Sequence, residues 1–212
     1  MMYHNSKPSK KLKTKLHVDG SDFRSCAPMG YETPVEPPLT VYFYTEIGDE
    51  ADYVEFCHAV RYAPEGQPIT IHINSPGGNL NSCMAIINAI QASAAHIVTV
   101  VDGEAASAAA MIWLAGHAKI IASRHTVVML HGASVGYHPS KVSDIATSTK
   151  ATEKITEALL DDLSDGFLTD EERDDIRKGV DVYLTGTDII ERLGIKAIGY
   201  DEQEEEIDDS QE

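Results

Sequence analysis

The chain has 212 residues, of which 42% are apolar, enough for one soluble domain with a buried core. It carries 34 Asp and Glu against 17 Lys and Arg, and the formal charge of -17 argues against nucleic acid as a ligand because the phosphates would be repelled. The longest uncharged stretch, residues 73–101, is interrupted by proline, glycine and asparagine, so no membrane partner is expected. Three cysteines without C-x-x-C spacing indicate neither a disulfide framework nor a zinc site, which favours the cytoplasm.

Both ends of the chain differ from its middle in composition. Residues 1–38 contain a cluster of five lysines and then Pro34, Pro37 and Pro38, with no helical or alternating apolar pattern. Residues 201–212 hold eight acids. We therefore predict a flexible N-terminal arm over 1–38, a folded domain over 39–200 and an acidic C-terminal tail over 201–212.

Inside the folded region the apolar period changes back and forth between that of strands and that of helices. In chain order the pattern predicts strands at residues 40–45 and 69–73, a helix at 80–90, a strand at 96–101, an apolar helix at 105–115, strands at 119–122 and 126–130, a long helix at 139–163, a helix at 169–178, and a closing strand, helix and strand at 182–184, 187–193 and 196–198. Strands that alternate with helices favour parallel strands joined by crossovers, so the predicted fold class is α/β.

A pair of glycines follows the strand at 69–73, in the segment Asn-Ser-Pro-Gly-Gly-Asn at 74–79. Gly77 and Gly78 permit a backbone path that is closed to residues with a Cβ, and the freed N–H groups point outward near a helix start. Such N–H groups can bind a developing oxyanion. The alternative is a tight turn without a ligand, and this motif alone does not separate the two.

A second turn of this kind surrounds Ser107, one crossover later, in the segment Gly-Glu-Ala-Ala-Ser-Ala at 103–108. Its small neighbours let the backbone approach another element and leave the hydroxyl unscreened. A serine near a helix start is more often a cap or a small core residue, so a structural role is the alternative. If both turns lie at the carboxyl ends of adjacent parallel strands, their backbone donors converge on one crevice.

A serine nucleophile needs a base within hydrogen-bond reach and a third group that orients the base. His131 is the best-placed base because it directly follows the strand at 126–130 and precedes Gly132. Asp181, just before the strand at 182–184, is the candidate acid. Their ordinary interpretations are a surface histidine at a strand end and an acid in a turn.

Taken together, these residues resemble the ClpP family, the proteolytic subunits of Clp serine proteases. The similarity is carried by Ile-Asn-Ser-Pro-Gly-Gly at 73–78, Gly-x-Ala-Ala-Ser at 103–107, the strand that ends in His131 and Gly132, and Asp-Val-Tyr-Leu-Thr at 181–185 followed by Glu-x-x-Gly-Ile at 191–195. The order of Ser107, His131 and Asp181 is also the order in that family. The resemblance covers about residues 39–200.

The resemblance implies the ClpP/crotonase fold, with repeated β-β-α units and a protruding handle helix at 139–163. It implies a nucleophile at Ser107, a base at His131 and an orienting acid at Asp181. The backbone N–H groups of Gly78 and Ala108 would form the oxyanion hole, and no cofactor or metal is implied.

A homo-oligomeric ring, a heptamer or a stacked 14-mer, is implied as well, with a polypeptide substrate cleaved inside a chamber. The rings would meet through the handle, whose apolar positions fit one packed face: Val142, Ile145, Ala146, Ile155, Leu159 and Leu163. Divergent chains with unusual termini also resemble phage-encoded proteases of capsid or scaffold proteins, for which the compartment would be the host cytoplasm.

Coupling to a Clp-type ATPase is a separate question. The family often has aromatic residues on the strand that receives the ATPase loop, whereas Thr70 and His72 stand at those places here. We therefore expect weak or no coupling, with the alternative that Tyr42, Phe43 or Tyr44 rebuilds the groove from the neighbouring strand.

The leading hypothesis is a serine endopeptidase of a self-compartmentalised ring. One alternative is a crotonase-like acyl-CoA enzyme, which also uses two backbone N–H groups after glycine-rich turns but has no need for Ser107, His131 and Asp181. The other is a catalytically inactive ring or scaffold subunit. Labelling by a fluorophosphonate at a serine would separate the first hypothesis from both alternatives.

Overall fold

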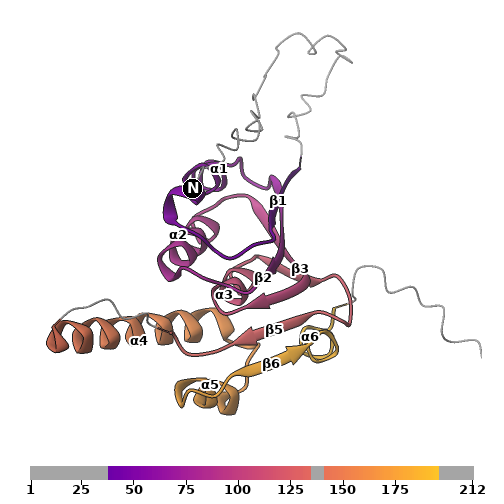
Figure 1. Cartoon of the computed structure of the whole chain (residues 1–212). Helices are drawn as coiled ribbons and strands as arrows, with labels where there is room; N and C mark the ends of the chain where they lie inside the picture. The colour runs from indigo at the N-terminus through magenta and orange to yellow at the C-terminus, as the bar shows by residue number, and fades with distance from the viewer. Residues whose placement is uncertain (1–37, 135–140, 196–212) are drawn as a thin grey trace, which may run out of the picture. The chain divides into compact units, whose positions relative to one another are not determined.

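The structure, a computed structural model, describes residues 38–134 and 141–195 (Figure 1). Within these ranges six strands form one sheet in the order β1-β2-β3-β5-β6, and β4 pairs with β3 beside this path. The strands are β1 (Leu39–Phe43), β2 (Pro68–Ser75), β3 (His96–Ala106), β4 (Ala118–Ile121), β5 (Val127–Leu130) and β6 (Val182–Thr185).

The helices are the short 3-10 helix η1 (Glu50–Tyr53) and α1 (Val54–Arg61), α2 (Leu80–Gln91), α3 (Ala108–Leu114), α4 (Val142–Ser164), α5 (Asp170–Arg177) and α6 (Gly186–Leu193). A search of the described ranges finds no helix with the length and apolar character needed to cross a bilayer. The α/β class is confirmed. The predicted strand at 196–198, the acidic tail and all of the predicted arm except residue 38 lie outside the described residues.

The core lies where one face of the sheet meets α1, α2 and α3. Alternation along β2 buries Ile69, Ile71 and Ile73 completely on this face, because successive side chains of a strand point to opposite sides. Trp113 of α3 is also fully buried, and its indole N–H donates to the Ile120 carbonyl at 3.2 Å. The rigid part of the domain therefore lies directly beneath the turns that follow β2 and β3.

β3 changes partner along its length. Its residues 98–101 pair with β4, while residues 104–106 pair with β5, both in parallel. β6 then pairs with β5 in antiparallel fashion, so the prediction of parallel strands is wrong at this edge. The physical reason is that α4 and α5, between β5 and β6, return the chain to the end of β5 rather than to its start.

Two helix predictions also need correction. The helix predicted at 105–115 starts at Ala108, because Ala105 and Ala106 pair with Val128 and Met129 in the β3–β5 ladder. Alanine fits either conformation, so its sequence pattern did not mark the boundary. The helix α1 was not predicted; it has only eight residues and buries only Cys57 and Val60.

The handle helix α4 is present over 142–164, and residues 139–140 of the prediction lie outside the described part. Its apolar residues do not form one packed face within the chain. Val142 is 83% exposed and Ile155 42% exposed, whereas Leu160 is buried near the end of the helix. α4 projects away from the sheet in Figure 1, so most of its length has no neighbour among the described residues.

Candidate active site

Ser107 occupies the turn between β3 and α3. Its φ of 55° makes it the one described non-glycine residue with a positive φ, a strained conformation that costs on the order of 1–3 kcal/mol and persists only where its surroundings impose it. The Ser107 N–H donates to the Met129 carbonyl at 2.8 Å, so β5 holds the turn in place. The Ser107 side chain makes no capping hydrogen bond to α3. The turn thus presents the hydroxyl instead of using it as a helix cap.

The glycine pair of the first turn packs directly against the Ser107 turn. A Cβ on Gly77, whose φ is 94°, would lie 2.6 Å from the Ala106 carbonyl oxygen and 2.8 Å from the Ser107 Cβ. On the other side, the Ile47 N–H donates to the Gly77 carbonyl at 2.8 Å. Only a residue without a Cβ fits between these two segments, which is why the sequence has glycine there.

Two backbone donors near Ser107 are free. The Ala108 N–H is the first of α3 and has no partner within the helix, as is general for a helix start. The Gly78 N–H likewise donates no hydrogen bond to any described residue. Both residues line the same pocket as Ser107 and His131. The structure therefore brings four of the five predicted site residues together.

The fifth, Asp181, lies just beyond the end of the β5–β6 ladder, as His131 does. The last pair of the antiparallel ladder is Leu130 with Val182, and His131 and Asp181 each lie one residue beyond it. Residues opposite each other in such a ladder have Cβ atoms about 4.5–5.5 Å apart. Asp181 is exposed and does not line the pocket, and among the described residues no hydrogen bond joins the side chains of Ser107, His131 and Asp181.

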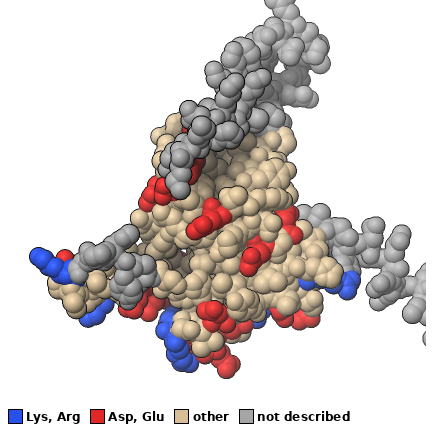
Figure 2. All heavy atoms as spheres, viewed as in Figure 1, with Lys and Arg blue, Asp and Glu red and all other residues tan. Residues whose placement is uncertain are grey.

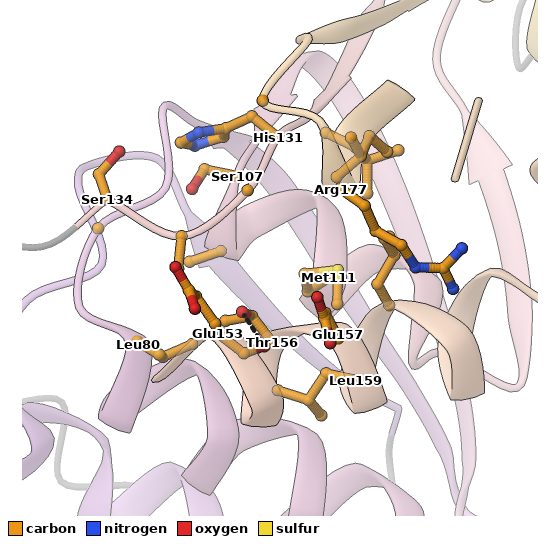
Figure 3. A pocket seen from close by; sticks show the side chains of 18 residues that line it. Leu80, Ser107, Met111, His131, Ser134, Glu153, Thr156, Glu157, Leu159 and Arg177 are labelled. Carbon is orange, nitrogen blue, oxygen red and sulfur yellow. Dashed lines mark hydrogen bonds between the residues drawn. The ribbon is translucent and has the colours of Figure 1, made fainter. Parts of the chain in front are cut away.

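The pocket beside Ser107 has a volume of about 470 Å³ (Figure 3). Its apolar lining comes from five elements or their flanking turns: Leu80, Met111, Leu130, Leu159, Leu160 and Ile176. Its wall on α4 also contains Glu153, Thr156 and Glu157, which we did not predict. The positions 153, 156, 157 and 160 follow the i, i+3, i+4, i+7 spacing of one helix face, but three of the four residues are polar, so the apolar pattern gave no signal for this wall.

A cysteine lies behind the nucleophile turn. The Cys83 thiol is completely buried and donates to the Ala108 carbonyl, with the sulfur 3.3 Å from the oxygen. Burial raises the pKa of Cys83 to about 12. It therefore stays a neutral thiol at neutral pH and is unreactive, since the thiolate is the reactive form.

Comparison with known proteins relates this site to one family. A family model described as Clp protease matches residues 40–191. The ATP-dependent Clp protease proteolytic subunit 1 of Rhodococcus jostii (strain RHA1) is 40% identical over 88 residues, which cover 41% of this chain and 40% of that protein. Subunit 3 of Parasynechococcus marenigrum (strain WH8102) is 34% identical over 116 residues, 54% of this chain and 57% of that protein.

A third relative is the proteolytic subunit 2 of Corynebacterium jeikeium (strain K411), 36% identical over 97 residues that cover 45% of this chain and 46% of that protein. The chain thus spans about half the length of the curated relatives it matches. The family model, by contrast, covers nearly the whole described region, from β1 to α6. With its mixed sheet, handle helix and paired turns, the chain has the ClpP fold and belongs to the Clp protease family.

Proposed function

We propose that the chain is a serine endopeptidase that acts within a closed ClpP-like ring on unfolded polypeptide segments, with phage capsid or scaffold polypeptides as a second substrate class. One observation carries the proposal: Ser107, His131, Gly78 and Ala108 line a single pocket. The family assignment supports the same chemistry. The family assignment also argues against the hypothesis of an acyl-CoA enzyme, in which Ser107 and His131 would have no role.

In the proposed mechanism the Ser107 Oγ attacks the peptide carbonyl carbon while a nitrogen of the His131 ring takes the hydroxyl proton. The carbonyl oxygen becomes an oxyanion and is held by the N–H groups of Gly78 and Ala108. His131 then returns the proton to the leaving amine, and water hydrolyses the acyl-enzyme by the same route. Asp181 fixes the orientation and tautomer of His131.

A ring is proposed because a protease of unfolded segments needs walls that exclude folded proteins. The exposed apolar residues of α4, Val142 and Ile155, support this assembly, since they have no cover within the described chain. Closed cyclic symmetry would bury such patches between identical subunits.

The proposal is tested by exposing the purified full chain to a fluorophosphonate and recording both the adduct site and the native mass of the same sample. We expect covalent modification at Ser107 and the mass of a closed ring. A monomeric mass together with no serine adduct would contradict the proposal. Modification at Ser107 in a monomer would support the serine peptidase chemistry and contradict the closed ring.

The glycine turn yields a prediction with a matched control. Gly77→Ala is expected to lower kcat/KM by about 100-fold, because its Cβ has to displace the Ser107 turn and a shift of roughly 1 Å can cost that much. Gly66→Ala also puts alanine at a positive φ of 74°, but nothing lies within 4 Å of its Cβ. Gly66→Ala should lose less stability, because only the positive φ strains it, and should keep its activity. Equal activity losses in the two variants, measured beside their melting temperatures, would reject a role for Gly77 in positioning Ser107.

The surface around Thr70 and His72 bears on the ATPase partner. The Asp102 carboxylate accepts a hydrogen bond from the Tyr44 hydroxyl at 2.5 Å and lies 2.9 Å from the His72 Nδ1. Tyr42 stacks on His72 with ring centroids 5.0 Å apart. The hydrogen bond to Asp102 raises the pKa of Tyr44 to about 12. Tyr42 of β1 and Tyr44, which directly follows β1, thus add exposed aromatic surface, while Phe43 is buried in the core.

We expect weak or no ATP-dependent stimulation by a conventional Clp unfoldase. An apolar anchor on this surface would have to desolvate the Asp102–His72 pair, and losing an anchor contact costs about 2 kcal/mol or more. The measurement is degradation of a tagged folded protein with and without unfoldase and ATP. The double variant His72→Tyr, Asp102→Val should gain stimulation. Strong stimulation of the unaltered protein that is abolished by mutating the unfoldase loop would contradict this prediction. It would show that Tyr42 and Tyr44 provide enough aromatic surface to bind the loop.

A further inference from the structure

The α4 wall of the pocket has no part in the proposed mechanism. In Figure 3 Glu153, Thr156 and Glu157 lie on the side of the pocket away from His131. They are contributed by one helix face, so their relative positions are fixed by α4. A side chain of a substrate bound with its carbonyl at Ser107 would extend along this wall.

The charge of this wall is negative and uncompensated. Neither the Glu153 nor the Glu157 carboxylate forms an ion pair or a hydrogen bond with any described residue; Glu153 accepts from the Thr156 hydroxyl only through its backbone carbonyl. Arg177 also lines the pocket, but its guanidinium is already paired with two carboxylates, 2.5 Å from Asp161 and 2.9 Å from Asp174. Figure 2 shows that Asp and Glu are spread across the visible face while Lys and Arg lie toward its edges, so the wider surface adds to the negative potential.

The pocket also has an apolar wall. Met111 of α3 and Leu159 of α4 are half-buried, and Ile176 of α5 is buried. They line the same space as the two glutamates. A ligand that suits both features has a long aliphatic stem and a positive end, because the stem packs on apolar side chains while the charge stays near the carboxylates. Among amino-acid side chains these are lysine and arginine.

We propose that this pocket selects a lysine or arginine residue at the scissile bond, with Glu153 and Glu157 as the specificity-determining residues. The inference rests on the proposed peptidase function, since it concerns which substrates that site accepts. Thr156 lies between the two glutamates and lines the pocket with them, but its hydroxyl already donates to the backbone carbonyl of Thr152. It therefore contributes shape rather than charge.

The first test compares fluorogenic peptides that differ only in the residue before the reporter group: lysine, arginine, methionine or glutamate. For the unaltered chain we expect kcat/KM for lysine to exceed that for methionine by about tenfold, as two partly exposed charge pairs would give. The preference should weaken with added salt, because exposed charges are screened. The glutamate peptide should be the poorest substrate.

The variants are Glu153→Gln, Glu157→Gln and the pair together. The double variant should bring the lysine-to-methionine ratio close to one and remove its salt dependence. The matched control is Glu55→Gln, an exposed glutamate of α1 that does not line the pocket, which should leave the ratio unchanged. A ratio that stays the same in the double variant would overturn the inference.

A binding measurement separates failure of this inference from failure of the proposed function. Fluorescence anisotropy of the labelled lysine and methionine peptides on Ser107→Ala protein needs no turnover, and we again expect about tenfold tighter binding of the lysine peptide. Cleavage without a lysine preference would reject the selectivity and keep the peptidase. A lysine preference in binding with no fluorophosphonate adduct on the unaltered chain would reject the peptidase and keep the cationic subsite. Equal binding of both peptides would overturn the inference whatever the activity.

Discussion

Replacing Ser107 by alanine is expected to reduce peptide hydrolysis by about four to six orders of magnitude, because members of a catalytic unit act together and little remains when one is lost. His131→Ala should have an effect of similar size, and the double variant should be hardly worse than either single one. Stability should change little, since the Ser107 side chain makes no hydrogen bond to a described residue. The measurements are kcat/KM on a neutral peptide and the melting temperature.

The matched control is Ser148→Ala. Ser148 is exposed on α4, does not line the pocket and donates only to the Ile145 carbonyl. Its activity should equal that of the unaltered chain. Ordinary turnover by purified Ser107→Ala would overturn the assignment of the nucleophile, and strictly additive losses in the double variant would mean that Ser107 and His131 act independently.

Asp181→Asn is expected to reduce kcat by about 10²–10⁴-fold with little change in KM, because an amide favours the wrong tautomer of the base. The prediction rests on the ladder that places Asp181 beside His131, one residue past the pair of Leu130 with Val182. Removing an exposed carboxylate should cost little stability.

Asp49→Asn serves as the control for Asp181→Asn. Asp49 is exposed before η1, and its side chain makes no capping hydrogen bond. In steady-state kinetics, kcat of Asp181→Asn should be lower than kcat of Asp49→Asn by the same factor of about 10²–10⁴. A near-normal rate in Asp181→Asn would show that a different acid orients His131, and a large rise in KM with unchanged kcat would assign Asp181 to substrate binding.

The two turns of this site could be predicted from the local sequence. Gly77 and Gly78 were recognisable because only glycine follows the backbone path they take, and Ser107 stood out among small residues. The strained backbone of Ser107 was not predictable, because it is imposed by Met129 and Gly77, which contact it only in the folded chain. Ala105 and Ala106 were placed in a helix for the same reason, since their strand pairing depends on β5.

Long-range features were harder to predict. The reversal of β6 depends on the path of α4 and α5, about which a strand pattern at 182–184 carries no information. The exposure of Val142 and Ile155 fits the expectation that rings meet through the handle, but apolar periodicity alone indicates only that a face is to be buried and not whether the partner belongs to the same chain. The acidic wall of the pocket was missed because Glu153 and Glu157 resemble the solvated face of any surface helix.

The antiparallel pairing of β5 and β6 has a consequence for how such a protein can evolve. His131 and Asp181 are the first and last residues of one long connection, residues 131–181. The β5–β6 ladder holds the two ends of this connection close together. The entropic cost of closing a connection rises only slowly with its length. Insertions within it are therefore tolerated as long as the ladder at its two ends is kept. The proposed base and acid lie at the two ends of the connection, whereas Glu153, Glu157 and the exposed part of α4 lie within it. Selection can therefore change the proposed substrate-binding and subunit-contact residues in this segment while the proposed base and its orienting acid keep their positions.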